Sequence, residues 1–225
     1  MKVAVTQMTS GGAIRENLAT AVQLVKRAAL AGVQAVFLPE ATDFIATPDR
    51  AAELTRSDDN RAFVQGMRDA AREHAVWISV GVHESSETDT KRCYNTQLLI
   101  DQHGTICAQY RKLHLYDVDI LNGPSILESN TTIPGDKLVP PVDTPLGRIG
   151  VRVTVANPAP DLLRHAFPRS VARAASPGRT VDHLPVGVCS SHGGCPLVLA
   201  SPNACHRDAV LRPRRGPSRY VSCTH

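Results

Sequence analysis

The sequence predicts one α/β domain with a mixed β-sheet, followed by a tail of different composition. Short apolar runs alternate with longer amphipathic segments in the order β-α-β-α-β-β-β, which is typical of helices packed on a sheet. The chain has 225 residues, of which 42% are hydrophobic and 20% are charged. This is enough for one globular domain with a substantial core, and it excludes a chain that is disordered throughout.

The first half of the domain is expected to alternate strands and helices. Residues 3–8 alternate apolar and polar side chains, as a half-buried strand does. Residues 14–30 predict an amphipathic helix, and Gly32 is placed to end it as the C′ residue. Residues 33–38 are apolar, β-branched and too few for a helix, so we expect a buried strand. The apolar stripe of the helix is predicted to contain Leu18, Val22, Val25, Ala29 and Leu30.

The second half is expected to be richer in strands. The predicted elements are a helix over residues 60–74, strands over residues 76–82, 94–100 and 105–110, and a strand over residues 147–151 after the proline-rich loop 140–145. Between the two middle strands, Gly104 can adopt a positive φ, so these strands are expected to form a hairpin.

Three charged residues are the candidates for chemistry. Glu40 follows Pro39 at the end of a predicted strand, Lys112 ends a later strand-like run, and Glu128 lies in a short loop. Taken one by one, each has an ordinary interpretation as a solvated surface or loop residue. Taken together, a glutamate and a lysine presented at strand ends indicate a catalytic pair that requires a nucleophile.

Several motifs within residues 1–150 carry a family resemblance. They are Val3-Ala-Val-Thr-Gln-Met8, Leu38-Pro-Glu-Ala41, Tyr110-Arg-Lys-Leu-His-Leu115, Glu128-Ser129 and Thr144-Pro-Leu-Gly-Arg-Ile-Gly150. In these motifs the chain resembles the nitrilase superfamily of carbon–nitrogen hydrolases. The resemblance is closest to the branch of deaminated glutathione amidases and ω-amidases, notably over residues 112–119 and 128–135.

The resemblance implies a fold and a mechanism. The fold is an α-β-β-α sandwich, here truncated. In this family a cysteine attacks an amide carbonyl, with Glu40 as general base, Lys112 stabilising the tetrahedral intermediate and Glu128 as auxiliary carboxylate. Such a pair suits the task, because only a thiolate is a good nucleophile and a lysine opposes the charge of the oxyanion. The implied substrate is a small amide such as deaminated glutathione or an ω-amide, with no cofactor and no metal.

The nucleophile is missing from its family position. The family's cysteine follows the Gly-Arg-Ile-Gly strand within a few residues, whereas here no cysteine follows Gly150 until Cys189. Cys93 and Cys107 lie in the predicted hairpin strands and are expected to be core thiols. The chain as written is therefore predicted to be catalytically inactive.

The composition changes at about residue 150. Residues 151–225 contain ten Arg and three Asp but no Lys and no Glu. Read one nucleotide forward, the codons of residues 162–169 permit Cys-Tyr-Asp-Met-Arg-Phe-Pro-Glu, the family's nucleophile motif, and residues 191–212 permit its later motifs. Our hypothesis is that residues 1–152 are the N-terminal part of a carbon–nitrogen hydrolase domain. Residues 153–225 are then an out-of-frame, poorly ordered tail, with loss of the dimer contacts usual in this homo-oligomeric family.

Two other interpretations of the tail are weaker. Its cysteines and histidines are zinc-ligand types, but Cys189, His192, Cys195, Cys205 and His206 contain no paired Cys-x₂-Cys spacing. Ten arginines suit nucleic acid, but the tail has only Phe167 and Tyr220 as aromatics and no recognition motif. The competing function is a non-catalytic interaction protein that uses the same scaffold and a basic tail.

The location expected from sequence is the cytoplasm, with mitochondria as the alternative. The first predicted strand begins at residue 3, which leaves no room for a secretory signal. An uninterrupted apolar run of about 18 residues, as a transmembrane helix requires, is absent from the sequence.

Overall fold

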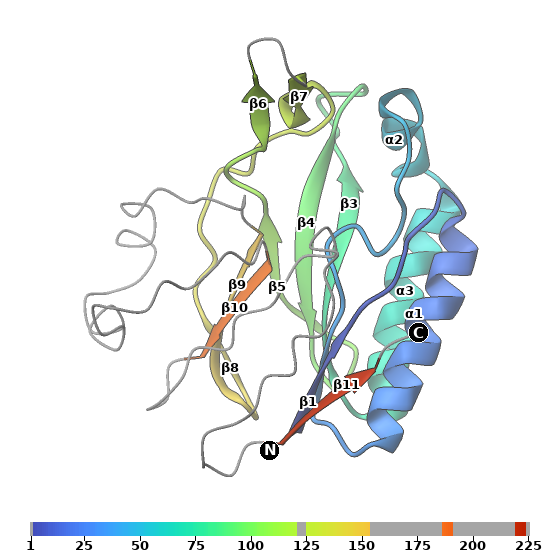
Figure 1. The fold of residues 1–225 in the computed structure, drawn as a ribbon, viewed down its shortest axis with the longest axis vertical. Helices are drawn as coiled ribbons and strands as arrows, with labels where there is room; N and C mark the ends of the chain where they lie inside the picture. The colour runs from blue at the N-terminus through green and yellow to red at the C-terminus, as the bar shows by residue number, and fades with distance from the viewer. Residues whose placement is uncertain (1, 121–124, 154–185, 191–218, 224–225) are drawn as a thin grey trace, which may run out of the picture.

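The computed structural model describes residues 2–120, 125–153, 186–190 and 219–223, and confirms the predicted α/β class (Figure 1). The helices are α1 (Ile14–Leu30), α2 (Pro48–Leu54), α3 (Asp58–His74) and the short 3₁₀ helix η1 (Glu128–Asn130). The strands are β1 (Lys2–Thr6), β2 (Ala35–Phe37), β3 (Trp77–Ser85), β4 (Cys93–Ile100), β5 (Ile106–Arg111), β6 (Asp117–Asp119), β7 (Ser125–Leu127), β8 (Val142–Thr144), β9 (Gly147–Val153), β10 (Val186–Ser190) and β11 (Arg219–Cys223).

A six-stranded mixed sheet in the order β11-β1-β2-β3-β4-β5 forms the centre of the domain. Its first strands are parallel, and β3, β4 and β5 form an antiparallel meander. Parallel strands require crossover connections, which α1 and the α2–α3 segment supply. The mixed sheet predicted from the order of elements is confirmed.

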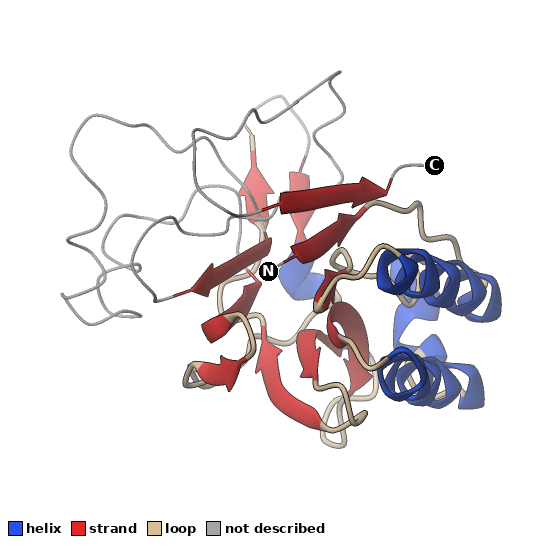
Figure 2. Ribbon diagram, turned by 90° about the horizontal axis from the view of Figure 1, so that it is seen from below, coloured by secondary structure: helices blue, strands red, loops and turns tan. Residues whose placement is uncertain are grey.

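The sheet is covered differently on its two faces. Helices α1 and α3 lie side by side on one face, as Figure 2 shows, and pack there through Leu24, Val25, Phe63 and Met67, all fully buried. The other face receives the three-stranded sheet β10-β9-β8, whose strand β9 packs against β4 and β5. The described elements therefore form the α-β-β layers of the predicted sandwich.

Helix α1 has the predicted bounds, and four of the five residues of its predicted stripe lie in or against the core; Leu30 does not. Leu30 is 81% exposed. The buried residues of helix α1 are Ile14, Asn17, Ala21, Leu24, Val25 and Ala28. Leu18, Val22 and Ala29 are partly buried at the edge of this stripe. The prediction weighted large apolar side chains, whereas small alanines allow the helix to approach the sheet closely. Gly32 has φ +73° and ends the helix as expected.

The sequence prediction missed helix α2, strands β6, β7, β8, β10 and β11 and the 3₁₀ helix η1, and it misplaced one thiol. Helix α2 begins at Pro48, whose fixed φ favours the first helical turn, but it has only seven residues and a weak periodic signal. Strand β8 lies within the segment predicted as a proline-rich loop. Cys93 is buried as predicted, but Cys107 is exposed because its side chain points away from the core on β5. The hairpin at Gly104, with φ +78°, is confirmed.

The loop after β2 approaches strand β3 so closely that only glycine fits at position 81. A Cβ atom there would lie 2.5 Å from Glu40 Cα and 2.8 Å from Pro39 O. The backbone of Gly81 also donates to Pro39 O and accepts from Thr42 N. The contact thus fixes the loop that carries Glu40.

We predict that Gly81→Ala lowers the free energy of unfolding by about 1–3 kcal/mol, because the added methyl group forces backbone atoms apart. Urea denaturation at neutral pH measures the change. Gly11→Ala is the matched control, since a Cβ atom there meets nothing within 4 Å. An equal effect of the two substitutions would contradict the close approach.

Candidate active site

The structure brings the three predicted site residues together. Lys112 Nζ lies 3.2 Å from Glu40 Oε1 and 3.0 Å from Glu128 Oε2. The lysine side chain is 6% exposed, and the two carboxylates are 20% and 16% exposed. The solvated-surface interpretation of the three residues is therefore wrong, because the cluster is largely withdrawn from water.

Glu40 is positioned by a tight turn at the carboxyl end of β2. Leu38 N donates to Ser79 O at 2.8 Å, which continues the parallel pairing with β3 one residue past the strand. Ala41 then takes a positive φ of 54°, a conformation that non-glycine residues adopt rarely. This strained turn points the preceding glutamate toward β4 and β5 rather than along the strand.

Lys112 is positioned by backbone contacts on both sides. It follows directly after β5, and its N–H donates to Asn95 O on β4 at 2.8 Å. Its own carbonyl accepts from Gly135 N at 2.8 Å. The lysine backbone is thus held between β4 and the segment after η1, so that its side chain reaches across to the turn after β2.

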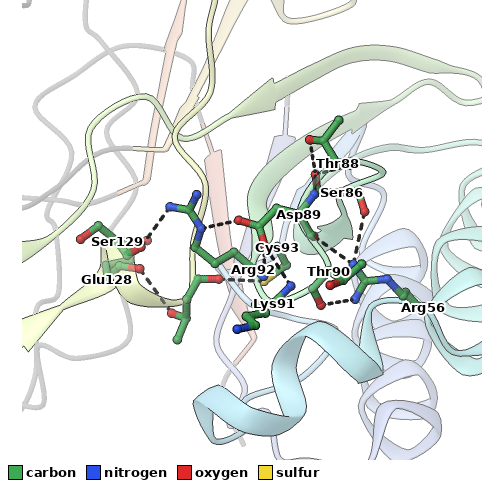
Figure 3. Close-up of polar contacts among 11 residues, drawn as sticks. Arg56, Ser86, Thr88, Asp89, Thr90, Lys91, Arg92, Cys93, Glu128 and Ser129 are labelled. Carbon is green, nitrogen blue, oxygen red and sulfur yellow. Dashed lines mark hydrogen bonds and ion pairs between the residues drawn. The ribbon is translucent and has the colours of Figure 1, made fainter.

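Glu128 opens the 3₁₀ helix η1, and its carboxylate accepts from Tyr116 N at 2.6 Å. Hydrogen bonds join the η1 turn to the start of β4, as Figure 3 shows. Cys93 N donates to Thr131 O at 3.0 Å, and Arg92, which is paired with Asp89, donates to Ser129 O. Strand β4 therefore supports both the lysine and the second glutamate.

Asn95 is a site residue that the sequence prediction missed. Its side-chain N–H₂ group donates to Glu40 Oε1 and, at 3.5 Å, to Glu128 Oε1. It therefore bridges the same two carboxylates that Lys112 pairs. The available signal in the sequence was the polar run Asn95, Thr96 and Gln97 within a predicted strand. All three side chains are buried in the structure, and buried polar groups are usually hydrogen-bonded.

The electrostatics of the cluster keep the lysine charged. Burial alone would lower the pKa of Lys112, but the charges of Glu40 and Glu128 and their hydrogen bonds outweigh it, so its pKa is raised. A lysine with a raised pKa does not act as a base at neutral pH. Its chemical capacity is to stabilise negative charge, while the carboxylates beside it can accept a proton.

A second buried pair, Asp43 and His83, lies next to the cluster and was also missed. The Asp43 carboxylate is fully buried and accepts from His83 Nδ1 at 2.9 Å, His83 N at 2.7 Å, Asn60 Nδ2 at 3.0 Å and Phe44 N at 2.9 Å. Burial lowers the pKa of His83, but Asp43, with smaller effects from Glu40 and Glu128, raises it above 6.5 overall.

Neither cysteine whose side chain the structure describes is suited to be the nucleophile. Cys93 Sγ donates to Thr131 O, and burial, with the charge of Asp43, raises its pKa to about 11. Cys107 is exposed on β5, and its pKa is also raised, by its partial burial and by Asp101. Both are thiols rather than thiolates at neutral pH, and thiols are weak nucleophiles.

Comparison with known proteins identifies the family. The model of the carbon-nitrogen hydrolase family matches residues 2–167. The chain belongs to the carbon–nitrogen hydrolase family. A probable hydrolase, Nit2, of Schizosaccharomyces pombe is 42% identical over 148 residues, which are 65% of this chain and 54% of the relative. Human deaminated glutathione amidase is 40% identical over 164 residues, which are 71% of this chain and 50% of the relative.

Solved structures show the same fold. The Caenorhabditis elegans NitFhit protein superposes with a TM-score of 0.61 at 36% identity, over 65% of this chain and 36% of that one. The amidase of Nesterenkonia sp. AN1, in complex with acrylamide, has a TM-score of 0.62 at 22% identity, over 77% of this chain and 61% of that one. The chain spans about half the length of the curated relatives it matches.

Several predictions for this carbon–nitrogen hydrolase fall outside the described side chains. They concern the cysteines and histidines of the tail, its arginines, and the out-of-frame hypothesis, which stays a prediction. In the part that the structure describes, no group of three His, Cys, Asp or Glu side chains could hold a metal ion. Within the same residues, no helix is long and apolar enough to cross a membrane.

We predict that Lys112→Met lowers the free energy of unfolding by about 3–5 kcal/mol, because it leaves two buried carboxylates without their cation. Urea denaturation at pH 7 measures the loss. Lys137→Met, at an exposed lysine, is the control. Adding Glu40→Gln to Lys112→Met should restore part of the lost stability; a further loss instead would contradict the charge balance described above.

We also predict that the ring of His83 titrates with a pKa above 6.5, measured by NMR of its Cε1 proton. A raised pKa means that the His83–Asp43 pair stabilises the fold fully below the unfolded pKa. This stabilisation is lost as the pH rises through the folded pKa. In Asp43→Asn the midpoint of the His83 titration should move to lower pH, because burial lowers the pKa of the ring and the Asp43 carboxylate no longer opposes it. An unchanged midpoint in this variant would refute the assigned cause.

Proposed function

We propose that this chain carries the Glu–Lys half of an amidase active site of the Glu-Lys-Cys type. The supporting observation is the buried Lys112 between Glu40 and Glu128, at the positions of the family motifs. The substrate class we propose is a small linear amide, such as deaminated glutathione or an ω-amide. The relatives named as deaminated glutathione amidases support this choice.

In the proposed chemistry, Glu40 accepts a proton and then returns it in each of the two half-reactions. Glu40 takes the proton of the cysteine thiol as its sulfur attacks the amide carbonyl, and Lys112 stabilises the oxyanion that forms. Glu40 returns the proton to the nitrogen, the amine leaves (ammonia from a primary amide, a peptide amine from deaminated glutathione), and a thioester remains. Glu40 then accepts a proton from water, whose oxygen attacks the thioester. It returns this proton to the cysteine sulfur as the C–S bond breaks and the acid leaves. Glu128 holds Lys112 in place, since it contributes the shorter of the two ion pairs.

We further propose that the chain as written lacks this cysteine and is inactive. The described thiols are unsuited, as argued above, and the sequence after Gly150 departs from the family's nucleophile motif. A mis-placed splice boundary between Arg152 and Leu162 would account for the departure. The expected sites of action, the cytoplasm or mitochondria, and the homo-oligomeric state of the family remain predictions for the protein with its frame restored.

Amide hydrolysis is the test, measured as release of ammonia from an ω-amide or of the cysteinylglycine dipeptide from deaminated glutathione. The chain as written is compared with a protein whose reading frame after Arg152 follows the sequenced transcript. We expect release only from the restored protein. In that protein, Glu40→Gln and Lys112→Met should each lower kcat by at least about 10²-fold. Cys107→Ser is the control for loss of a thiol, because this exposed residue lies outside the cluster. The restored protein with this substitution should keep its full activity.

Two outcomes would contradict the proposal. Release by the chain as written that disappears in Lys112→Met would refute the absence of a nucleophile. A restored protein that retains full activity in Lys112→Met would refute the role of the cluster. An in-frame transcript that encodes the tail as written would refute the splice hypothesis alone.

A further inference from the structure

A cavity of about 150 Å³ lies beside the Glu40–Lys112–Glu128 cluster. Ala41, which follows Glu40 in the chain, forms part of its wall, and so do Thr131 and Thr132, which follow the Glu128 turn. The opposite wall is apolar and comes from the segment between β2 and α2 and from α2 itself. The same two segments that position the carboxylates thus also shape this cavity.

His83 enters the cavity from the side of the sheet that carries the cluster. In the antiparallel pairing of β3 and β4, His83 lies directly opposite Asn95. Directly opposite residues project from the same face of a sheet, with Cβ atoms about 5 Å apart. Because the Asn95 side chain reaches both carboxylates, the imidazole of His83 stands next to the cluster, one strand away.

The His83 ring is fixed so that one nitrogen is left for a ligand. Nδ1 bonds to the Asp43 carboxylate, which only accepts, and the ring stacks on Phe44 with centroids 4.4 Å apart and planes at 26°. Nε2 has no hydrogen-bond partner among the described residues and is not sealed in the core. The hydroxyl of Thr132, which also lines the cavity, has no hydrogen-bond partner among these residues either.

The charges around the ring select the kind of ligand. Three carboxylates act on His83, those of Asp43, Glu40 and Glu128. They favour the protonated ring, in which Nε2 is a donor. They also repel any further anion placed against it. An uncharged oxygen acceptor therefore suits Nε2–H and the Thr132 hydroxyl better than a carboxylate does, and the apolar wall suits a planar, uncharged group.

We propose that this cavity is a substrate subsite for the carbonyl oxygen of a second, uncleaved amide group, with His83 Nε2–H and the Thr132 hydroxyl as its donors. The inference rests on the proposed amidase function, because it places this group beside the scissile amide at Lys112. Of the two substrates proposed above, it therefore favours deaminated glutathione, which carries a second, uncleaved peptide amide, over an ω-amide, which carries a carboxylate at its other end.

Binding to the chain as written tests the subsite directly, since a chain without the nucleophile does not consume the probe. The probes are glutaramide and glutarate, which share one carbon skeleton and differ in charge. We expect glutaramide to shift the Cε1 proton resonance of His83 saturably at millimolar concentration. Glutarate should bind at least about tenfold more weakly, because like charges oppose it. The resonance is assigned by its absence in His83→Gln.

Thr132→Val provides the variant test, because it preserves the shape of the side chain and leaves the Asp43 pair intact. Loss of one neutral hydrogen bond should weaken glutaramide binding about three- to tenfold. Thr105→Val, an exposed substitution in the β4–β5 turn, is the matched control and should leave binding unchanged.

Three results would overturn the inference: no shift of the His83 resonance, equal or tighter binding of glutarate, or equal binding by Thr132→Val and the control. Its failure is separable from that of the proposed function. A restored protein that hydrolyses the amide while the probes leave His83 unshifted removes the subsite alone. An inactive restored protein with specific glutaramide binding at His83 removes the amidase proposal alone.

Discussion

The constraint on which the described domain depends is the burial of one lysine between two carboxylates. A buried cation without partners costs several kcal/mol, and so do two buried carboxylates without a cation. Lys112, Glu40 and Glu128 therefore stabilise the fold only when all three arrive together. Glu40 follows β2, Lys112 follows β5 and Glu128 begins η1. This one cluster therefore joins three segments that are distant in sequence.

The backbone around the cluster explains how three distant segments meet within about 3 Å. Gly81 on β3 lets the turn of Glu40 approach closely, and β4 supports the remainder. The backbone carbonyl of Asn95 accepts a hydrogen bond from Lys112 N, and its side-chain amide donates to the carboxylates of Glu40 and Glu128. Because β3 and β4 are interior strands of the six-stranded sheet, the turns that carry the site are held by strands that are themselves paired on both sides.

Local patterns predicted the elements well, and the tertiary contacts less well. Helix α1 and the Gly104 hairpin depend on periodicity and turn chemistry, which are readable along the chain. The exposure of Leu30 and Cys107 depends on which face meets the sheet, and this is set by packing rather than by hydrophobicity alone. Asn95 and His83 were missed because their partners come from cross-strand pairing and from loops, which motif spacing does not encode.

The geometry of the cluster does not depend on the segment that would supply the nucleophile. Among the described residues, the side-chain hydrogen bonds and ion pairs of Glu40, Lys112 and Glu128 come from residues between β2 and Gly135. Under the proposed function, a change of sequence after β9 removes the attacking thiol and leaves the three charged groups in place. The proposed subsite at His83 and Thr132 is built from the same segments, so substrate binding and bond cleavage are separable in this molecule.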